Sequence, residues 1–567
     1  MLSILKLLFL FFTSTTLAVE NHKKAAPYLL EHNLTNRQHP LPEKQVQSPT
    51  YIAFVNALDV LQADYFRIWP GVWPTAIDWT SAVLGTSVAG ALRTFSSSLS
   101  EVSSPPIAAN IINRYFSQLS ASFFGQDIFA LQQQAFDDML WVTLEWIESI
   151  CFIEERSLDY TTSPIGGPWY GQQWKSDFAH RARVFWDLAA HGWNTALCNG
   201  GMIWNPRQLP YKNAITNELY ISASIAMYLY FPGDNNNSPF QKTISNVPNT
   251  NFIHKPQDVK YLNAAIEAYE WLYAINMTND DGLFVDGFHI SGWNTTFSNN
   301  TQCDERNEMV YTYNQGVLLS GQYGLYVATG VRSYLEDGHK LISNVIRATG
   351  WDIDNANISS SLSKSNLKPQ QDKWYGLGRN GILEEACDAS ATCSQDSQTF
   401  KGIFFHHLTK FCSTLTDPIS TPKETTQSPQ DIQDWHHNSC QRYGSWIKHN
   451  ADAALRTLDS QGRFGAWWGV AANSTENHTI KNNEAPIPSG AIDYRSNGIP
   501  QDWNVNNKKR REEHQRHDIV KRDNNDPQVR DPNDRGRGRT VETQSGGLNV
   551  LRAFLEIVER PQDNFKI

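Results

Sequence analysis

Charged residues are scarce in this chain, and long apolar runs are absent after its first residues. Charged side chains make up 19% of the 567 residues, and hydrophobic residues make up 40%, whereas typical soluble domains carry about 25% charged residues. Enough apolar mass is therefore present for a large core, which excludes general disorder. The net charge of −10 gives no global electrostatic attraction for nucleic acid. After the N-terminus, no stretch reaches the ~20 apolar residues that a membrane span needs, so we expect no span.

Cysteine is sparse as well, and its spacing is uninformative for metals. No CxxC pair and no histidine at zinc spacing accompanies any cysteine, so we expect neither a metal site nor a cofactor. An odd number leaves at least one thiol free or intermolecular. The short separation of Cys387 and Cys393 favours a disulfide between them. The seven cysteines are Cys151, Cys198, Cys303, Cys387, Cys393, Cys412 and Cys440.

The first 18 residues have the pattern of a secretory signal peptide. Lys6 supplies a positive charge, Leu7–Phe12 is wholly apolar, and Thr16–Ala18 offers a small-residue cleavage site. The last residues, Gln562–Ile567, lack the hydrophobic tail of a glycolipid anchor signal. Eight Asn-x-Ser/Thr sites suit a glycoprotein. We therefore expect a secreted, extracellular or cell-wall-associated protein, and we expect a monomer.

Aromatic residues are abundant, with 19 Trp, 21 Tyr and 27 Phe. Trp and Tyr offer a flat apolar face with a polar edge. A sugar ring also has an apolar face and a polar rim, so this composition favours carbohydrate handling. The alternative explanation is a large aromatic core.

Helical periodicity dominates the chain, and strongly alternating strand patterns are scarce. About eleven or twelve helices joined by long loops predict an all-α fold. No repeat of solenoid length is visible. The expected helices are 51–66, 106–120, 129–154, 178–191, 213–230, 259–274, 313–329, 333–349, 397–412, 431–458 and 540–559.

One segment, residues 504–539, breaks the helical pattern. It holds 11 Lys/Arg and 7 Asp/Glu in 36 residues and no Leu, Phe or Tyr. Such a segment cannot bury a core, and we expect it to be disordered. Its basic clusters at 508–511 and 521–522 belong either to a solvated linker or to a dibasic processing site.

Asp137 and Asp138 are the most informative residues for chemistry, because two adjacent acids begin an otherwise apolar, aromatic helix. Adjacent carboxylates repel each other, although a helix N-terminus favours anions. The generic alternatives are a helix cap or surface turn and a divalent-ion site. Retaining glycosidases need two carboxyl groups ~5–5.5 Å apart, one as nucleophile and one as acid/base. Like-charge coupling would raise the pKa of one carboxyl group and leave it protonated.

Together with the aspartate pair, an ordered series of short motifs resembles glycoside hydrolase family 76, the endo-α-1,6-mannanase family of bacteria and fungi. The similar segments run in family order from about residue 50 to 475 and resume near residue 542. The motifs are Cys198–Gly201, Trp204–Pro206, Tyr211–Leu219, Asp286–Gly287, Thr312–Leu318, Gly381–Glu384, Asp396 with Phe400–Phe404, and Glu542–Gly547.

The resemblance implies an (α/α)6 barrel and retaining hydrolysis of α-1,6-mannosidic bonds without a metal. On the matching positions, Asp137 corresponds to the nucleophile and Asp138 to the acid/base. The domain arrangement is then a signal peptide at 1–18, an N-terminal segment at 19–50, a catalytic barrel at 51–503 and 540–560, and the charged insertion at 504–539.

Further residues are candidates for binding the mannan or another mannose-containing glycan. Five of them match family motifs and have side chains suited to hydrogen bonds with sugar hydroxyls. For Asn213 and Asn217, the alternative role is helix capping or loop bracing. Asp286 either lines the site or caps a turn, and Lys401 either binds sugar or pairs with Asp396. Trp141, Trp204 and Trp293 either stack on mannose or pack in the core. The five hydroxyl-binding candidates are Asn213, Asn217, Tyr313, Asn314 and Gln315.

Three functions fit the sequence. The first is a secreted endo-α-1,6-mannosidase. The second is a cell-wall transglycosylase that acts on mannose-containing glycolipid-anchor glycans through the same covalent intermediate. The third is an inactive carbohydrate-binding wall protein, against which the presence of both aspartates counts.

Overall fold

The structure of the protein is a computed structural model that describes residues 48–99, 104–161, 168–236, 254–293, 299–358, 373–420, 428–473, 485–495 and 531–560. The predicted signal peptide at 1–18 lies outside the described residues. Helices dominate the described part of the chain, and its strands are short.

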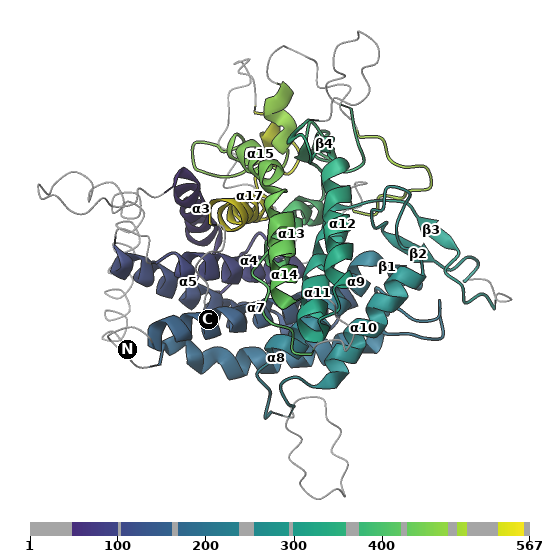
Figure 1. Cartoon of the computed structure of the whole chain (residues 1–567), viewed down its shortest axis with the longest axis horizontal. Helices are drawn as coiled ribbons and strands as arrows, with labels where there is room; N and C mark the ends of the chain where they lie inside the picture. The colour runs from purple at the N-terminus through teal and green to yellow at the C-terminus, as the bar shows by residue number, and fades with distance from the viewer. Residues whose placement is uncertain are drawn as a thin grey trace, which may run out of the picture. The chain divides into compact units, whose positions relative to one another are not determined.

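Six helices of the described chain form a closed inner ring (Figure 1). Each helix of the ring contacts the next one along the chain, and the last contacts the first. Two of them, α9 and α11, are buried on almost every face, as expected for helices at the centre of a large protein. The ring consists of α4 (Asp78–Ser97), α7 (Phe136–Thr161), α9 (Ala214–Tyr230), α11 (Thr312–Thr329), α13 (Gln395–Phe411) and α17 (Val541–Phe554).

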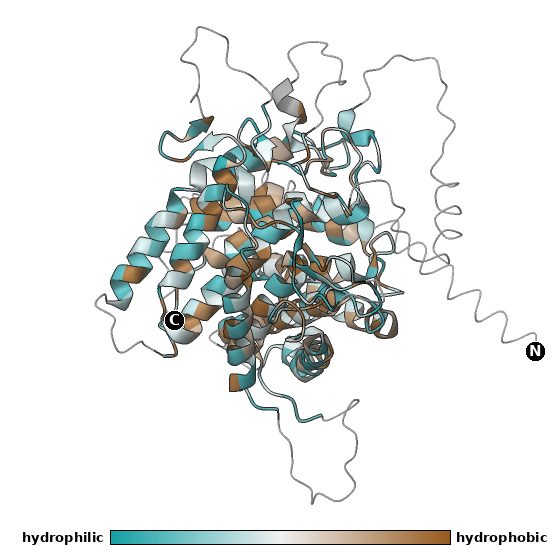
Figure 2. Ribbon diagram, turned by 90° about the vertical axis from the view of Figure 1, so that its right-hand side faces the viewer, coloured by the Kyte–Doolittle hydropathy of each residue, from teal (hydrophilic) through white to brown (hydrophobic). Residues whose placement is uncertain are grey.

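An outer layer of helices alternates with this ring along the chain. Each outer helix packs on an inner one and buries only one face. In α12, for example, Leu335, Ile342 and Val345 are buried on one side. Figure 2 shows hydrophilic and hydrophobic residues alternating along the helices, as one-sided burial requires. The outer helices are α3 (Pro49–Val60), α5 (Pro105–Gly125), α8 (Lys175–Ala189), α10 (Val259–Ala274), α12 (Ser333–Arg347) and α15 (Gly444–Leu455).

The two layers make an (α/α)6 barrel, which confirms the predicted fold class. Local sequence signals set the ends of several helices. The side chains of Ser394, Ser428 and Thr540 cap the N-termini of α13, α14 and α17. Gly330 ends α11 with a φ of 69°, a backbone conformation that favours glycine. The remaining helices and helical turns are α6 (Ile128–Leu131), α14 (Pro429–Gln441), η2 (Leu61–Tyr65), η3 (Tyr170–Trp174), η4 (Ala190–Gly192), η5 (Trp468–Asn473), η7 (Pro532–Asp534) and η8 (Leu555–Glu559).

Short antiparallel strands decorate the barrel. The largest group orders β1, β2 and β3 side by side and joins the start of α9. Asn213 in β1 pairs with Gly287 in β2, where any Cβ on residue 287 would lie 2.7 Å from the Asn213 Cα. This close approach fixes Asp286 beside the first turn of α9. The strands are β1 (Tyr211–Asn213), β2 (Gly287–His289), β3 (Glu305–Asn307), β4 (Trp351–Asp352) with β5 (Asn357–Ile358), and β6 (Gly378–Arg379) with β7 (Ile382–Leu383).

Helix α4 is an inner helix that the sequence analysis missed. Its residues are mostly small and buried all round, so no polar face marks the helical period. Its glycines allow close packing: a Cβ at Gly85 would lie 2.0 Å from the Glu145 carboxylate. Two predicted helices are also divided in the structure, at 131–136 between α6 and α7 and at 441–444 between α14 and α15.

The charged segment predicted to be disordered at 504–539 is described only in its last part. Residues 504–530 lie outside the described residues. Residues 531–539 are ordered: they contain η7, and Arg539 forms ion pairs with Asp531 and Asp534. Asn533 accepts a hydrogen bond from the Trp467 main-chain N–H at 2.8 Å. The predicted disordered segment therefore extends too far toward the C-terminus, because residues 531–539 are ordered. The density of charges in the sequence does not show that these side chains have partners.

Three disulfides join cysteines of the described chain. The favoured Cys387–Cys393 pair is confirmed, and Cys198–Cys303 and Cys412–Cys440 accompany it. Cys151 keeps a buried thiol, in agreement with the odd count. In the described part of the chain, no helix combines the length and apolarity that crossing a bilayer requires.

Candidate active site

The first turns of the inner helices meet at one end of the barrel. Each inner helix follows an outer helix that returns along the barrel, so the inner helices run in one direction. Hydrogen bonds join their first turns. The Trp79 indole donates to Asp396 at 3.1 Å, which connects α4 with α13. Thr80 and Gln395 donate to one Glu542 oxygen at 3.1 and 2.8 Å, which connects both helices with α17.

Acidic side chains are concentrated at this end. Helix N-termini carry unpaired N–H groups and a positive dipole end, and both stabilise anions. The first turns of four inner helices each contain at least one acid, and we call this set the acidic end. Its residues are Asp78 of α4, Asp137 and Asp138 of α7, Asp396 of α13 and Glu542 of α17.

Asp137 and Asp138 begin α7 within the acidic end. Asp138 accepts a hydrogen bond from the Ala135 N–H at 3.1 Å, and Asp137 accepts one from the Asp138 N–H at 3.1 Å. The Trp204 side chain also lies near Asp137 and favours its carboxylate form. The Trp204 carbonyl in turn accepts from the Phe136 N–H at 2.9 Å, which ties the Trp204 loop to the start of α7. Asp137 is 5% exposed, and Asp138 is partly buried.

The two carboxyl groups differ in their affinity for a proton. Burial raises the pKa of Asp137 to about 6, and Arg495, main-chain N–H groups and Trp204 limit that rise. Burial and the neighbouring Asp137 raise the pKa of Asp138 well above its ordinary value. Asp137 therefore ionises first, and Asp138 keeps its proton beside it. The pair can supply one carboxylate and one proton donor at the same time.

Arg495 lies at the centre of the site, and the sequence analysis did not single it out. Its guanidinium carbon is 5.4 Å from the centre of the Trp204 ring. Burial lowers the pKa of Arg495, but the electrostatic effect of Tyr313, Asp396, Asp286 and Asp137 outweighs it and raises the pKa well above its ordinary value. No sequence signal identified this residue, because it lies in an irregular segment before the charged insertion.

Asp286 and Tyr313 present polar atoms toward the same region. Asp286 accepts from the Tyr211 hydroxyl at 2.5 Å and from Asn307 at 3.2 Å, while its other oxygen has no hydrogen-bond partner among the described residues. The Tyr313 ring stacks on Phe400 with a centroid distance of 3.8 Å, and its hydroxyl lacks a partner in the same part of the chain. These unpaired atoms are buried, where a missing partner costs free energy.

The family is shown by comparison with known proteins. The family model described as "Glycosyl hydrolase family 76" matches residues 170–461, more than half of the chain. The chain belongs to this family. The matched range begins after Asp137 and Asp138. The assignment of these two residues to the candidate site therefore depends on the sequence resemblance and on the geometry described above.

Relatives within family 76 include two named yeast proteins. Mannan endo-1,6-alpha-mannosidase DCW1 of Candida albicans is 25% identical over 237 residues, 40% of this chain and 40% of the relative. Mannan endo-1,6-alpha-mannosidase DFG5 of Saccharomyces cerevisiae is 23% identical over 225 residues, 38% of this chain and 35% of the relative. The matches thus span about two fifths of the relatives' length.

A solved structure shares the fold of this family 76 chain. Dfg5 from Chaetomium thermophilum, in complex with glucosamine, superimposes with a TM-score of 0.50 and 13% identity. The superposition covers 91% of this chain and 92% of the other. At this identity the likeness concerns the fold alone.

Several predicted binding residues of this family 76 chain brace the protein itself. Asn217 exchanges hydrogen bonds with the Met202 main chain at 2.7 and 3.3 Å and donates to the Asn213 carbonyl at 2.8 Å. Gln315 exchanges hydrogen bonds with the Phe284 main chain at 2.8 and 2.9 Å. The side-chain amides of Asn217 and Gln315 are therefore both occupied by main-chain partners. For Asn217 this is the loop bracing that the sequence analysis gave as the alternative to sugar binding.

Lys401 and Trp141 are placed inside the barrel wall. Lys401 forms a buried ion pair with Asp388 rather than with Asp396. Trp141 is 3% exposed and stacks on Trp79 at 5.9 Å. Both side chains support the residues that surround the acidic end.

The remaining predicted residues are placed as follows. Asn213 and Asn314 are fully buried, and their amide groups have no hydrogen-bond partner among the described residues. Trp293, 41% exposed, lies in a turn after β2. Trp204 is joined to the start of α7 by the hydrogen bond between its carbonyl and the Phe136 N–H.

Two bracing residues escaped the sequence analysis. Glu385 accepts from both the N–H and the hydroxyl of Thr312, the first residue of α11, and so orients the turn that carries Tyr313. Lys212 donates to the carbonyls of Asn194 at 2.9 Å and of Gly200 at 2.8 Å. The sequence did contain a signal for Glu385: two adjacent glutamates, Glu384 and Glu385, follow apolar residues in the GILEE segment. Carboxyl groups that are buried need hydrogen-bond partners, so such a pair indicates a bracing role.

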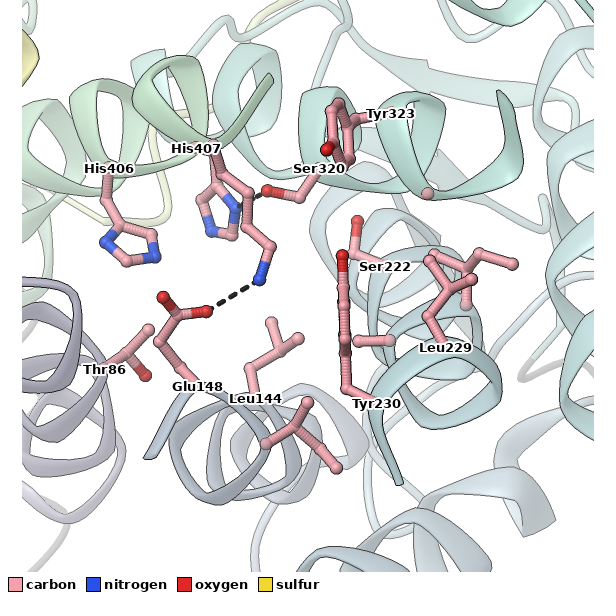
Figure 3. Close-up of a pocket in the computed structure, with 15 residues that line it drawn as sticks. Thr86, Leu144, Glu148, Ser222, Leu229, Tyr230, Ser320, Tyr323, His406 and His407 are labelled. Carbon is pink, nitrogen blue, oxygen red and sulfur yellow. Dashed lines mark hydrogen bonds and ion pairs between the residues drawn. The ribbon is translucent and has the colours of Figure 1, made fainter. Parts of the chain in front are cut away.

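A second polar cluster lies deeper in the barrel (Figure 3). Glu148 pairs with Lys410 at 2.7 Å, and His407 shares a hydrogen bond with Ser320 at 2.6 Å. His406 lies 3.1 Å from an Arg552 nitrogen. The cavity among these side chains holds about 20 Å³, room for about one water molecule and not for a sugar. His406 and His407 therefore contribute hydrogen bonds to the interior of the barrel.

Proposed function

We propose that this family 76 protein is a secreted glycoside hydrolase that cleaves α-1,6-mannosidic bonds within mannan with retention of configuration. The observation that carries the proposal is the buried Asp137–Asp138 pair at the start of α7, in which burial raises the pKa of both carboxyl groups and Asp137 raises that of Asp138 further. The names of the yeast relatives support the choice of substrate.

In the first step, the Asp137 carboxylate attacks the anomeric carbon of the mannose unit. The bond from that carbon to the glycosidic oxygen breaks, and Asp138 gives its proton to the departing oxygen. The product is a mannosyl ester on Asp137 and a shortened chain with a free hydroxyl. The higher pKa of Asp138 suits the proton donor, and the lower pKa of Asp137 suits the nucleophile.

In the second step, Asp138 accepts a proton from a water molecule. The water oxygen bonds to the anomeric carbon, the ester bond breaks, and Asp137 returns to its carboxylate form. Two inversions at one carbon give overall retention. A sugar hydroxyl in place of water would give transfer, so an acceptor sugar tests the alternative of a transglycosylase.

Neighbouring side chains supply the binding surface in this proposal. Trp204 offers an aromatic face next to Asp137. The unpaired oxygen of Asp286, the Tyr313 hydroxyl and the amides of Asn213 and Asn314 are candidates for hydrogen bonds to mannose hydroxyls. Lys401, Asn217 and Gln315 act indirectly, because their polar groups hold the surrounding chain.

Secretion is supported by the predicted signal peptide and by the three disulfides of the described chain. Disulfides persist in oxidising compartments. Of the eight predicted glycosylation sites, Asn276, Asn299 and Asn357 are exposed, as glycan acceptors must be.

The test is a reducing-end assay on linear α-1,6-mannan. We expect activity in the wild-type protein and a loss of at least about a thousandfold in Asp137→Ala and in Asp138→Ala. The chain offers a matched control in its other adjacent pair, Asp280 and Asp281, which is exposed in a turn. Alanine at both control positions should leave the rate unchanged.

Other outcomes would overturn the proposal. Wild-type protein that binds mannan without releasing fragments, with or without an acceptor sugar, would favour the inactive binding protein. A lengthened acceptor without hydrolysis would favour the transglycosylase.

A further inference from the structure

Hydrogen bonds anchor the segment of residues 485–495 to β3 and to the start of α11. Asn307 accepts from the Ile492 N–H at 2.7 Å and donates to the Ile492 carbonyl at 2.9 Å. The Tyr311 hydroxyl donates to Asp493 at 2.8 Å, and the same Asp493 oxygen accepts from the Arg495 N–H at 3.0 Å. These bonds fix the main chain of Arg495 independently of its side chain.

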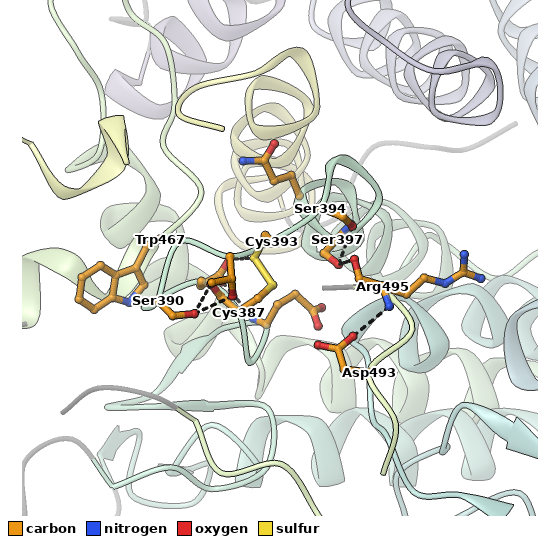
Figure 4. The surroundings of a disulfide bond; sticks show 12 residues. Cys387, Ser390, Cys393, Ser394, Ser397, Trp467, Asp493 and Arg495 are labelled. Atoms are coloured by element: carbon orange, nitrogen blue, oxygen red, sulfur yellow. Dashed lines mark hydrogen bonds between the residues drawn. A yellow bond between two sulfur atoms is a disulfide. The ribbon is translucent and has the colours of Figure 1, made fainter. Parts of the chain in front are cut away.

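The Arg495 side chain extends from this anchored segment toward the catalytic pair. Figure 4 shows it directed away from the Cys387–Cys393 disulfide. The guanidinium lies over the Trp204 ring, and the Trp204 carbonyl accepts a hydrogen bond from the N–H of Phe136, the residue before Asp137. Among the described residues, the buried Nε of Arg495 has no hydrogen-bond partner and Arg495 forms no salt bridge. The positive charge of Arg495 therefore acts on several acidic groups, among them Asp137, Asp286 and Asp396, rather than on a single ion-pair partner.

From this arrangement we propose that Arg495 is a positioning residue of the catalytic pair, which keeps Asp137 ionised beside a protonated Asp138. The inference rests on the proposed function for its catalytic consequence. It adds a role for a residue that comes from outside the barrel helices.

Charge balance is the physical reason. Nearly all the titratable groups around Asp137 are acidic, and without a cation their mutual repulsion would favour protonation of Asp137. Arg495 has the largest electrostatic effect that stabilises the Asp137 carboxylate. The titratable and charged groups that face this region are Asp138 on α7, Asp286 before β2, Tyr313 on α11, Asp396 on α13, Asp493 and Arg495 on the anchored segment, and Arg537 after η7.

The experiment compares the pH dependence of kcat/KM on linear α-1,6-mannan. Arg495→Gln should move the acid limb to higher pH by about one unit or more, because an adjacent opposite charge lowers a carboxyl pKa by about 1–3 units. At pH 5 this shift costs about tenfold in kcat/KM. The matched control is Arg442→Gln, which removes the same charge from an exposed pair with Asp354 and should leave the limb in place.

Two further variants make the result specific to charge. Arg495→Lys keeps the charge and should keep the acid limb near that of the wild type. Tyr311→Phe removes the hydrogen bond to Asp493 and should move the limb in the same direction by a smaller amount. A uniform loss of rate in Arg495→Gln at every pH, with the limb unmoved, would overturn the proposal and leave Arg495 a purely structural role.

A second readout separates this inference from the proposed function. The carboxyl ¹³C resonance of Asp137, identified by its loss in Asp137→Asn, can be titrated without substrate. We expect a higher pKa in Arg495→Gln than in the wild type, and equal values would overturn the inference. Failure of the wild type to cleave mannan would instead overturn the proposed function alone.

Discussion

Lys401 offers a prediction that distinguishes bracing from sugar binding. Its ammonium forms an ion pair with Asp388, and the two side chains are 3% and 0% exposed. Lys401 also lies 5.4 Å from the centre of the Trp468 ring. Lys401→Met keeps most of the side-chain length and removes the charge, so Asp388 is left buried without its partner.

The expected cost follows from the burial of this pair. Removing one member of a buried ion pair destabilises a protein by about 3–5 kcal/mol, because the other charge stays uncompensated. Burial raises the pKa of Asp388, and Lys401 opposes that rise. In Lys401→Met the Asp388 pKa therefore rises further, and protonation relieves part of the cost at low pH. The loss of stability should accordingly increase as the pH rises from about 5 to 8.

Thermal unfolding at a fixed heating rate measures this effect. An unfolding entropy of about 2.1 cal/mol/K per residue converts each kcal/mol into about 1 °C for a barrel of this size. We expect Tm to fall by about 3–5 °C in Lys401→Met. Asp388→Asn in the same background should recover part of the loss, which a double-mutant cycle would show. Lys448→Met, in an exposed pair with Asp452, is the matched control and should change Tm by less than about 1 °C.

A different pattern would refute the reasoning. An unchanged Tm together with a raised KM for mannan would mean that the Lys401 ammonium contacts sugar, as the sequence analysis allowed. The same loss of stability at pH 5 and pH 8 would mean that the Asp388 charge is not its cause.

Further predictions concern the pH profile and the packing of glycines. Activity should fall below about pH 6 as Asp137, whose pKa is about 6, takes up a proton. It should fall again at higher pH as Asp138 loses its proton, which gives a bell-shaped kcat/KM profile; a rate that rises steadily toward acid would contradict the assigned roles. Gly85→Ala should lower the free energy of unfolding by about 1–3 kcal/mol, because its Cβ would lie 2.0 Å from the Glu145 carboxylate. Gly546→Ala, whose Cβ would have no neighbour closer than 3.7 Å, should be tolerated in a denaturant titration.

Much of the barrel could be predicted from the sequence, and α4 shows the limit of that method. Periodicity found the helices that bury one face, because their polar faces mark the period. Helix α4 is buried by the ring on nearly all sides. Its sequence therefore consists mostly of small residues and has no polar face that would mark the helical period. Only the contacts with α7 and α17 reveal why Gly85 and Gly90 stand there.

The aspartate pair of the proposed mechanism could be singled out from the sequence because two adjacent acids at the start of an apolar helix are unusual. Arg495 could not, since a single arginine near a charged insertion has no pattern of its own. Its role depends on bonds between Asp493 and Tyr311, residues 182 positions apart in sequence.

The division between binding and bracing residues also needed coordinates. Asn217 and Gln315 have side chains that suit sugar hydroxyls and main-chain groups equally well. The structure assigns them main-chain partners, whereas the amide groups of Asn213 and Asn314 have none among the described residues. Sequence alone does not show which amide has a partner, because the partners are main-chain atoms of distant loops.

The central claim is that Asp137 forms the covalent bond to the sugar and Asp138 handles the proton. Covalent trapping tests it directly: the protein is incubated with a fluorinated α-mannosyl substrate that forms the glycosyl ester quickly and releases it slowly, and the peptides are then analysed by mass spectrometry. We expect one mannosyl adduct, located on Asp137, and none in Asp137→Ala. An adduct on Asp138, or turnover of the substrate with inversion and no adduct, would contradict the account.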